Sequence, residues 1–365
     1  MTRAHTLTER LEAIHGLLAD KMPGLARIAV VLYDPQTEML HTLAHSSGKD
    51  DPLSHYSVPL KSVPSLKAMV DNGTPRVVDD IPASYASASE HSRRIIGHGY
   101  RSSYTERMTH RGQVLGFVFF NGFEPGMFSG RTLPVVECAA RLVALTVGED
   151  LDASRILTGA IVALGKVARV RDPETGAHLQ RMSRFSREIA FGVAGRWRLD
   201  DEFIEKLYLY APLHDIGKLA MPDAILLKPG PLDEREWQIM CQHPARGCEI
   251  VQIMMENASV PIPKAEILLN IIRHHHEHFD GTGYPDRLAG TRIPAEARIV
   301  AIADSFDALT TRRPYKDPWS NRDALDWIRA EAGRHFDPQG VAALADALPQ
   351  VEAIQASFQD PDVSA

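Results

Sequence analysis

The sequence has no long apolar run and almost no cysteine. Its most apolar segments, 28–33 and 114–120, have the length of single strands, whereas crossing a bilayer takes about 18 consecutive apolar residues. The N-terminus has no apolar core of the kind that marks a protein for export. The three cysteines form no CxxC pair, and so few thiols predict a reducing compartment without disulfides. We therefore expect a cytoplasmic protein without a membrane span.

The sequence also lacks an excess of positive charge. Its formal net charge is −7, from 40 Lys and Arg against 47 Asp and Glu. A protein that wraps a nucleic-acid polymer would need a basic surface instead, so that class of partner is excluded. Apolar residues make up 44% of the chain, which is ordinary for a globular protein. A length of 365 residues predicts two domains.

The first third of the chain mixes helix and strand patterns. Residues 7–20 repeat apolar side chains at helical spacing, and 25–33 and 37–44 are typical of two strands joined by a turn at 34–36. A further strand is expected at 113–120. This order of elements predicts an α+β domain of the sensor type.

The remainder is predicted to be helical. A helical segment begins near residue 133, and Leu157, Ile161, Leu164 and Ala168 continue it with heptad-like spacing. Two heptads do not decide whether this stripe packs on its own domain or forms a dimer. From about 150 to 350 the pattern contains no clear strand.

Histidine gives the first chemical signal. Seven of the 16 histidines fall between 178 and 278, several of them beside a carboxylate. Glu174 and His178 lie four residues apart, so on a helix both could reach one cation. His214 and Asp215 are adjacent, and Lys218 follows where its ammonium group can point back at a bound anion. Each pair alone is compatible with an ordinary exposed surface.

The later residues strengthen the metal interpretation. His243, a His275–His276 pair and Asp304 follow, and Asp304 stands among apolar neighbours, where an unpaired carboxylate is costly. Imidazole and carboxylate without thiolate favour iron or manganese over structural zinc. The set exceeds what one ion needs. Two or three divalent ions are therefore expected, a type of site suited to phosphoester hydrolysis.

These residues resemble the HD superfamily of metal-dependent phosphohydrolases, in its HD-GYP branch. The matching segments include RDPETGAH at 171–178, LHDIGK at 213–218, HHEHFDGTGYP at 275–285 and HFDP at 335–338, and the match covers nearly all of 150–345. The resemblance implies an all-helical bacterial enzyme that hydrolyses cyclic di-GMP to linear pGpG and, after a second cut, to GMP.

The resemblance also assigns roles to residues. Eight positions match the family's metal ligands, which is similar to its three-metal variant: Glu174, His178, His214, Asp215, His243, His275, His276 and Asp304. His214, Asp215 and Lys218 would be catalytic, with Asp215 bridging ions and Lys218 contacting the scissile phosphate. Arg313 and Lys316 would hold the substrate phosphates, and Tyr284 would lie in the loop that shapes the substrate cavity.

Other polar residues near these motifs are expected to support the site rather than bind metal. We predict that Asp307 orients the site or pairs with Arg313. His274 and His278 flank the paired histidines and are interpreted as supporting or surface groups.

The N-terminal region resembles a GAF domain more loosely, through short phrases at 58–60, 64–66, 72–75 and 77–80. The predicted organisation is a GAF-like sensory or dimerisation domain at 1–147, an HD-GYP domain at 148–350 and a tail at 351–365. The predicted fold class is α+β, an antiparallel sheet with helices joined by a long helix to an all-α domain. We expect a homodimer through the first domain and the joining helix, and a GGDEF-type or other signalling protein as a possible partner. The alternative function is a module that binds a cyclic dinucleotide or a protein with little turnover.

Overall fold

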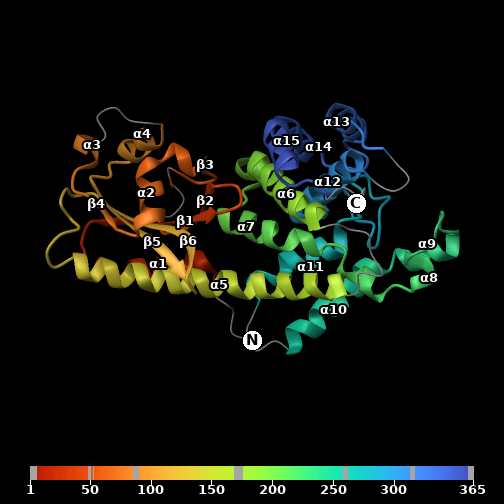
Figure 1. Cartoon of the computed structure of the whole chain (residues 1–365), viewed down its shortest axis with the longest axis horizontal. Helices are drawn as coiled ribbons and strands as arrows, with labels where there is room; N and C mark the ends of the chain where they lie inside the picture. Colours follow the sequence, from red (N-terminus) through yellow and green to blue (C-terminus); the bar gives the residue numbers. More distant parts are fainter. Residues whose placement is uncertain are drawn as a thin grey trace. The chain divides into compact units, whose positions relative to one another are not determined.

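The computed structural model describes residues 6–47, 51, 53–84, 90–167, 176–257, 262–312 and 317–360. The chain divides into two compact units, which are described separately (Figure 1). Unit 1 comprises Met1–Asp152 with Asp200–Glu202, and unit 2 comprises Ala153–Leu199 with Phe203–Ala365. Among the described helices, none combines the length and the apolar character needed to span a membrane.

Unit 1 is built on an antiparallel sheet. Its strands are β1 (Leu25–Asp34), β2 (Met39–His45), β3 (Ser57–Pro59), β4 (Arg76–Val78), β5 (Ser102–His110) and β6 (Gln113–Gly122). They lie in the order β3-β2-β1-β6-β5-β4. The predicted hairpin at 25–44 and the strand at 113–120 are confirmed as β1, β2 and β6. The sequence analysis missed β5, whose residues are mostly polar.

Helices cover the sheet on both sides, which explains why the apolar run in β1 is almost wholly buried. The helices of unit 1 are α1 (Leu7–Ala19), η1 (Leu60–Ser62), α2 (Pro64–Asn72), α3 (Ile81–Ser84) and α4 (Glu90–Gly97). The helix α1 contacts β1 and β2. On the other side, Leu60 and Leu66 pack with Phe117 of β6 in a buried cluster. The predicted α+β character of this region is confirmed.

Helix α5 (Leu133–Val167) contains residues of both units. Within unit 1 its buried positions include Val136, Val143 and Val147. Two members of the predicted heptad-like stripe, Ile161 and Leu164, have side chains outside the described part of the structure, and Ala168 lies outside the described residues altogether. The dimer interpretation of this stripe stays a prediction.

The described residues of unit 2 form helices joined by loops, with no strand and one isolated bridge between Ala332 and Phe336. This confirms the predicted all-α architecture. After the end of α5, its elements are α6 (Gly176–Trp197), α7 (Asp201–Tyr210, whose first two residues belong to unit 1), η2 (Ala211–Leu213), η3 (Ile216–Ala220), α8 (Asp223–Leu226), α9 (Glu234–Met240), α10 (His243–Asn257), α11 (Ala265–His274), η4 (Gly290–Arg292), α12 (Ala295–Thr310), α13 (Asn321–Ala330), α14 (Pro338–Asp346) and α15 (Leu348–Ser357).

Helix α6 is the centre of unit 2. It packs against α12 and α14, and it also contacts η2. Its buried residues lie on all its faces and include three arginines. A buried charge is costly without a partner, so each arginine needs a partner inside the protein. Arg184, for example, donates to the Gln180 side chain and lies over the Phe358 ring.

Candidate metal centre

Seven of the eight predicted ligands lie in described residues, and five separate elements supply them. His178 projects from α6 and Asp304 from α12, while His214 and Asp215 lie in the turn between η2 and η3. His243 begins α10 and His275 follows the end of α11, with His276 directly after it. The structure brings all seven together in two neighbouring groups.

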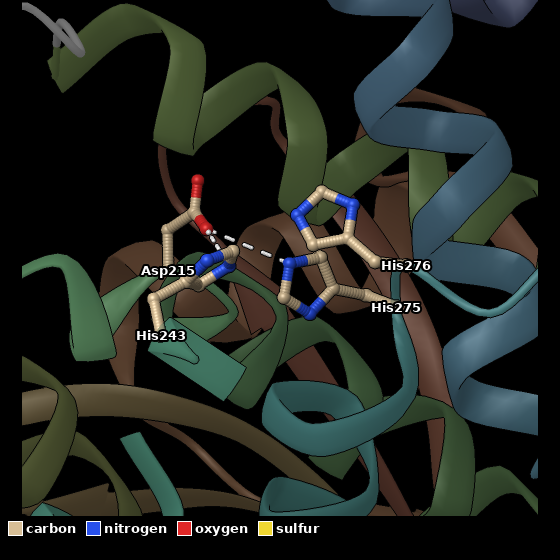
Figure 2. A group of neighbouring side chains, drawn as sticks. All are labelled: Asp215, His243, His275 and His276. Carbon is tan, nitrogen blue, oxygen red and sulfur yellow. Dashed lines mark ion pairs between the residues drawn. The ribbon is translucent and has the colours of Figure 1, made fainter. Parts of the chain in front are cut away.

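The first group consists of Asp215, His243, His275 and His276, and their ligand atoms lie within 4.8 Å of one another. Asp215 Oδ1 is 3.1 Å from His243 Nε2 and 3.5 Å from His275 Nε2. Figure 2 shows the carboxylate above the His243 ring and the His276 ring beside that of His275. Four donors from three elements therefore face one small volume.

The second group consists of His178, His214 and Asp304, again within 4.8 Å. Asp304 Oδ1 is 3.8 Å from His178 Nε2 and 3.9 Å from His214 Nε2. Asp215 connects the groups, because its Oδ2 lies 3.3 Å from His214 Nε2 while its Oδ1 faces the first group. A carboxylate in this position can bridge two ions.

Backbone carbonyl groups fix the orientation of three ligand rings. His214 Nδ1 contacts the Ala211 carbonyl at 3.1 Å, His243 Nδ1 the Met240 carbonyl at 2.9 Å, and His275 Nδ1 the Ile271 carbonyl at 3.0 Å. When Nδ1 donates to a carbonyl, the proton stays there and the Nε2 lone pair is free to bind a cation. Each of these contacts is local, so the helix ends themselves aim the Nε2 atoms.

The polar atoms left inside the first group fit a bound cation. His243 Nε2, His275 Nε2 and Asp215 Oδ1 are buried and have no hydrogen-bond partner among the described residues. Buried polar atoms normally form hydrogen bonds. Leaving three of them without partners would destabilise the protein in the absence of a cation. Imidazole nitrogen and carboxylate oxygen, without a thiolate, form the donor set of a divalent transition metal such as iron or manganese.

The protonation states also fit metal binding. Burial lowers the pKa of His275, and burial together with His275 holds the pKa of His276 well below its usual range. Burial alone would raise the pKa of Asp215, but Lys218 and His214 outweigh it and hold this pKa well below its ordinary value. Neutral imidazoles beside an ionised carboxylate are the forms that ligate metal.

Lys218 lies beside the ligand groups. Its Nζ is 2.6 Å from Asp215 Oδ2, and its side chain is 22% exposed. An anion that enters the site would therefore lie within reach of the ammonium group, which could turn from Asp215 toward it with little movement.

Two glycines allow the backbone approaches on which this geometry depends. A Cβ atom on Gly217 would lie 1.8 Å from the His243 carbonyl oxygen, so η3 could not pack on α10 at its present distance. A Cβ atom on Gly283 would lie 2.2 Å from the His278 nitrogen. Gly283 likewise places Tyr284, whose amide donates to the His276 carbonyl at 3.2 Å.

Asp307 supports His178 from behind. Its Oδ2 is 2.7 Å from His178 Nδ1, and its carboxylate accepts two bonds from Arg181, of 2.6 and 2.9 Å. The predicted orienting role is consistent with the structure, and Arg181 is a partner of Asp307; the predicted alternative, pairing with Arg313, lies outside the described residues. Sequence analysis missed Arg181, although its place three residues after His178 on one helix was a signal. Arg181 also binds the Phe358 carbonyl and Asp360.

The loop that follows the paired histidines is held by Glu277. This carboxylate is buried and accepts backbone N–H bonds from Asp286 at 2.7 Å and Leu288 at 3.0 Å. Within the loop, the Tyr284 ring stacks on His276 with centroids 4.8 Å apart. Burial raises the pKa of the Tyr284 hydroxyl, which therefore stays protonated. Glu277 was missed by the sequence analysis, since only the folded loop brings its partners near.

The flanking histidines lie outside the two ligand groups. His278 Nδ1 contacts the Thr282 hydroxyl at 3.1 Å. His274 joins Glu277 and Asp286 in a third group of possible ligands, but Arg273 already binds the Asp286 carboxylate through two bonds of 2.7 and 2.8 Å. We interpret this third group as structural. Glu174, Arg313 and Lys316 lie outside the described residues.

The buried histidines predict that the metal-free protein loses stability in mild acid. Burial lowers the pKa of His275, His276 and His335, the last from 6.5 to about 4. As the pH falls below about 6.5, the unfolded chain takes up protons that the folded chain does not, and each such histidine removes up to about 1.4 kcal/mol per pH unit. Urea unfolding in chelator should therefore show full stability above pH 7 and a steady loss from pH 6.5 to 5. A free energy of unfolding that stays constant over this range would contradict the prediction, and His335→Asn should reduce the slope.

Comparison with known proteins agrees with this geometry. Residues 167–340 match the model of the HD domain family. The chain is 43% identical over 195 residues to the cyclic di-GMP phosphodiesterase response regulator RpfG of Xanthomonas campestris, covering 53% of this chain and 49% of that protein. It is 40% identical over 199 residues to 3'3'-cGAMP-specific phosphodiesterase 2 of Vibrio cholerae, covering 54% and 36%. The chain thus spans half or less of the length of these two relatives.

Among solved structures, a GAF domain/HD domain protein from Geobacter sulfurreducens is 18% identical to this chain, with a TM-score of 0.30. The match covers 40% of this chain and 95% of that one. A cyclic GMP-AMP specific phosphodiesterase of V. cholerae is 19% identical with a TM-score of 0.39, covering 59% and 52%.

Proposed function

We propose that this chain, which carries an HD domain over residues 167–340, is a metal-dependent phosphodiesterase that hydrolyses cyclic di-GMP. The observation that carries the proposal is the position of Asp215, with one carboxylate oxygen toward each of two imidazole-rich ligand groups. Such paired sites are suited to in-line displacement at phosphorus. The names of the relatives supply the substrate class.

In this proposal Asp215, His243, His275 and His276 would hold one ion, and His178, His214 and Asp304 a second. Bound metal ions supply an activated water at neutral pH and neutralise charge on the phosphoryl oxygens. We further propose that Glu174 completes the set for a third ion, that iron or manganese is the resident metal, and that the products are pGpG and GMP. The nitrogen and oxygen donor set supports the choice of metals.

The protein's own groups prepare the site before substrate arrives. Backbone carbonyls fix the rings of His214, His243 and His275, so the geometry needs little reorganisation during the reaction. Lys218 would move its ammonium group from Asp215 to a phosphoryl oxygen and stabilise the charge that develops there. Arg313 and Lys316 would orient the remaining phosphate. We also propose that unit 1 regulates turnover and forms a homodimer, with a signalling protein as a possible further partner.

The test is turnover by anaerobically purified protein of known metal content. We expect iron or manganese in the protein, and conversion of cyclic di-GMP to pGpG or GMP on chromatography. Chelator should reduce the rate to background, and Fe²⁺ or Mn²⁺ should restore it. The assay should include 3'3'-cGAMP, since one relative is named for that substrate. A metal-loaded protein that binds the nucleotides and returns them intact would instead establish the alternative, a binding module.

A further inference from the structure

An exposed tryptophan lies close to the candidate metal centre. Trp237 is 51% exposed, more than the 37% of Trp319 and Trp327. It lies in α9, a short helix in which no residue is buried. Aromatic side chains at a surface can serve as platforms on which nucleic-acid bases stack.

Capping bonds and an ion pair hold the start of the helix that carries Trp237. The Asp233 side chain accepts from the Glu236 amide at 2.9 Å, and the Glu236 carboxylate accepts from the Asp233 amide at 2.8 Å. Lys228 closes the arrangement with an ion pair to Glu236. Two reciprocal capping bonds and an ion pair fix the start of α9. These bonds order the backbone from which the indole ring projects, so less backbone freedom is lost when a ligand binds.

Two ring contacts connect Trp237 to the metal ligands. The Trp237 ring meets Tyr284 edge to face, with centroids 6.1 Å apart. Tyr284 in turn stacks on His276 at 4.8 Å and 24°, and His276 belongs to the first ligand group. A phosphodiester held at that group would have its nucleoside within reach of the exposed indole. Tyr284 lies between them and orients the edge of the Trp237 ring.

We propose that Trp237 is the stacking platform for one purine base of a cyclic dinucleotide. The inference rests on the proposed function and adds a binding residue to it. Stacking accepts either guanine or adenine, because every base has an aromatic face. This explains how one surface could serve substrates such as those in the names of the two relatives, which differ in a base. A protein partner on the exposed face of α9 is the competing interpretation, and the test decides between them.

The experiment compares Trp237→Ala and Trp237→Phe with Trp319→Ala, a matched control at another exposed tryptophan of unit 2. Cyclic di-GMP should quench the intrinsic fluorescence of the metal-loaded wild type and of the Trp319 variant, but not of Trp237→Phe. Loss of a stacked base should raise KM or Kd about tenfold in Trp237→Ala, with kcat changed less than twofold and partial recovery in Trp237→Phe. Thermal unfolding midpoints should match the wild type, because α9 buries no residue.

Unchanged quenching and KM in the Trp237 variants would overturn the inference, and would leave α9 as a surface for a protein partner. A drop in kcat with unchanged KM would also overturn it, because Trp237 would then act only by positioning Tyr284. The proposed hydrolysis and the proposed stacking on Trp237 can each be refuted without refuting the other. A wild type that does not hydrolyse either dinucleotide, yet shows quenching that depends on Trp237, would refute hydrolysis and support the platform.

Discussion

Asp215→Asn is expected to remove both bound metal and turnover. The substitution keeps the shape of the side chain but removes the charge that faces both ligand groups and Lys218. Metal affinity should fall, because both ligand groups lose the anionic ligand that they share. The rate of hydrolysis should fall at least about 100-fold, as it does when an enzyme loses one preorganised electrostatic contact. Metal analysis by mass spectrometry and chromatography of the products would measure both effects.

The control for this variant is Asp326→Asn, which alters a carboxylate in an exposed ion pair with Arg329. Exposed pairs contribute little to stability, so this variant should keep its metal and its activity. Circular dichroism should show that both variants are folded. A purified Asp215→Asn protein with the metal content and turnover of the wild type would refute the bridging role.

Asp307→Asn should give the largest loss of stability of any single conservative change near the site. Asp307 is 1% exposed and joins His178 to Arg181. Burial alone would raise its pKa, but His178 and Arg181 outweigh burial and lower it, so the native group is ionised. Removing one member of a buried pair costs about 3–5 kcal/mol, because the remaining charge loses its buried partner; Arg181 would keep only the partly exposed Asp360 as a counter-charge. Urea unfolding in chelator would measure this loss.

The same variant should weaken metal binding, since His178 loses the partner that orients its ring. Substitution of a residue that hydrogen-bonds a metal ligand typically reduces metal affinity about 10–100-fold. A Mn²⁺ titration would detect this change. Thr311→Val is the matched control, because it removes the hydrogen bonds of the Thr311 hydroxyl to the same carboxylate and to Arg181 without changing any charge. Its cost should be about 1.5–3 kcal/mol, the range for hydrogen bonds to charged groups. Equal, small effects for the two variants would show that the charge of Asp307 is unimportant.

The sequence predicted those parts of the fold whose pattern is local. The hairpin at β1 and β2 was visible because apolar residues flank a turn triplet. The strand β5 was missed because its residues include Ser102, Ser103 and Thr105, which are buried only through pairing with β6 and β4. Whether the polar residues of a strand are buried depends on the strands beside it, so the sequence of the strand alone does not predict it.

The same limit explains why the metal ligands could be predicted from the sequence while the residues that support them could not. The ligands stand in compact motifs, which is why His214 and Asp215 could be singled out. Arg181 and Asp307 are 126 positions apart, so their pairing exists only when α6 meets α12. Trp237 is similar, because nothing in its own segment places it beside Tyr284. Its signal was weaker but present, an aromatic residue in a run of charged ones.

The contact of η3 with α10 has a consequence for how substitutions are tolerated. Gly217 and Gly247 let two stretches of main chain touch, and a Cβ on Gly217 would also lie 2.7 Å from the Gly247 nitrogen. The spacing between the His214–Asp215 turn and His243 is therefore set by polypeptide backbone, which cannot yield as a flexible side chain does. A saturation survey should find Gly217 as intolerant as any residue that binds an ion, although it has no chemistry of its own.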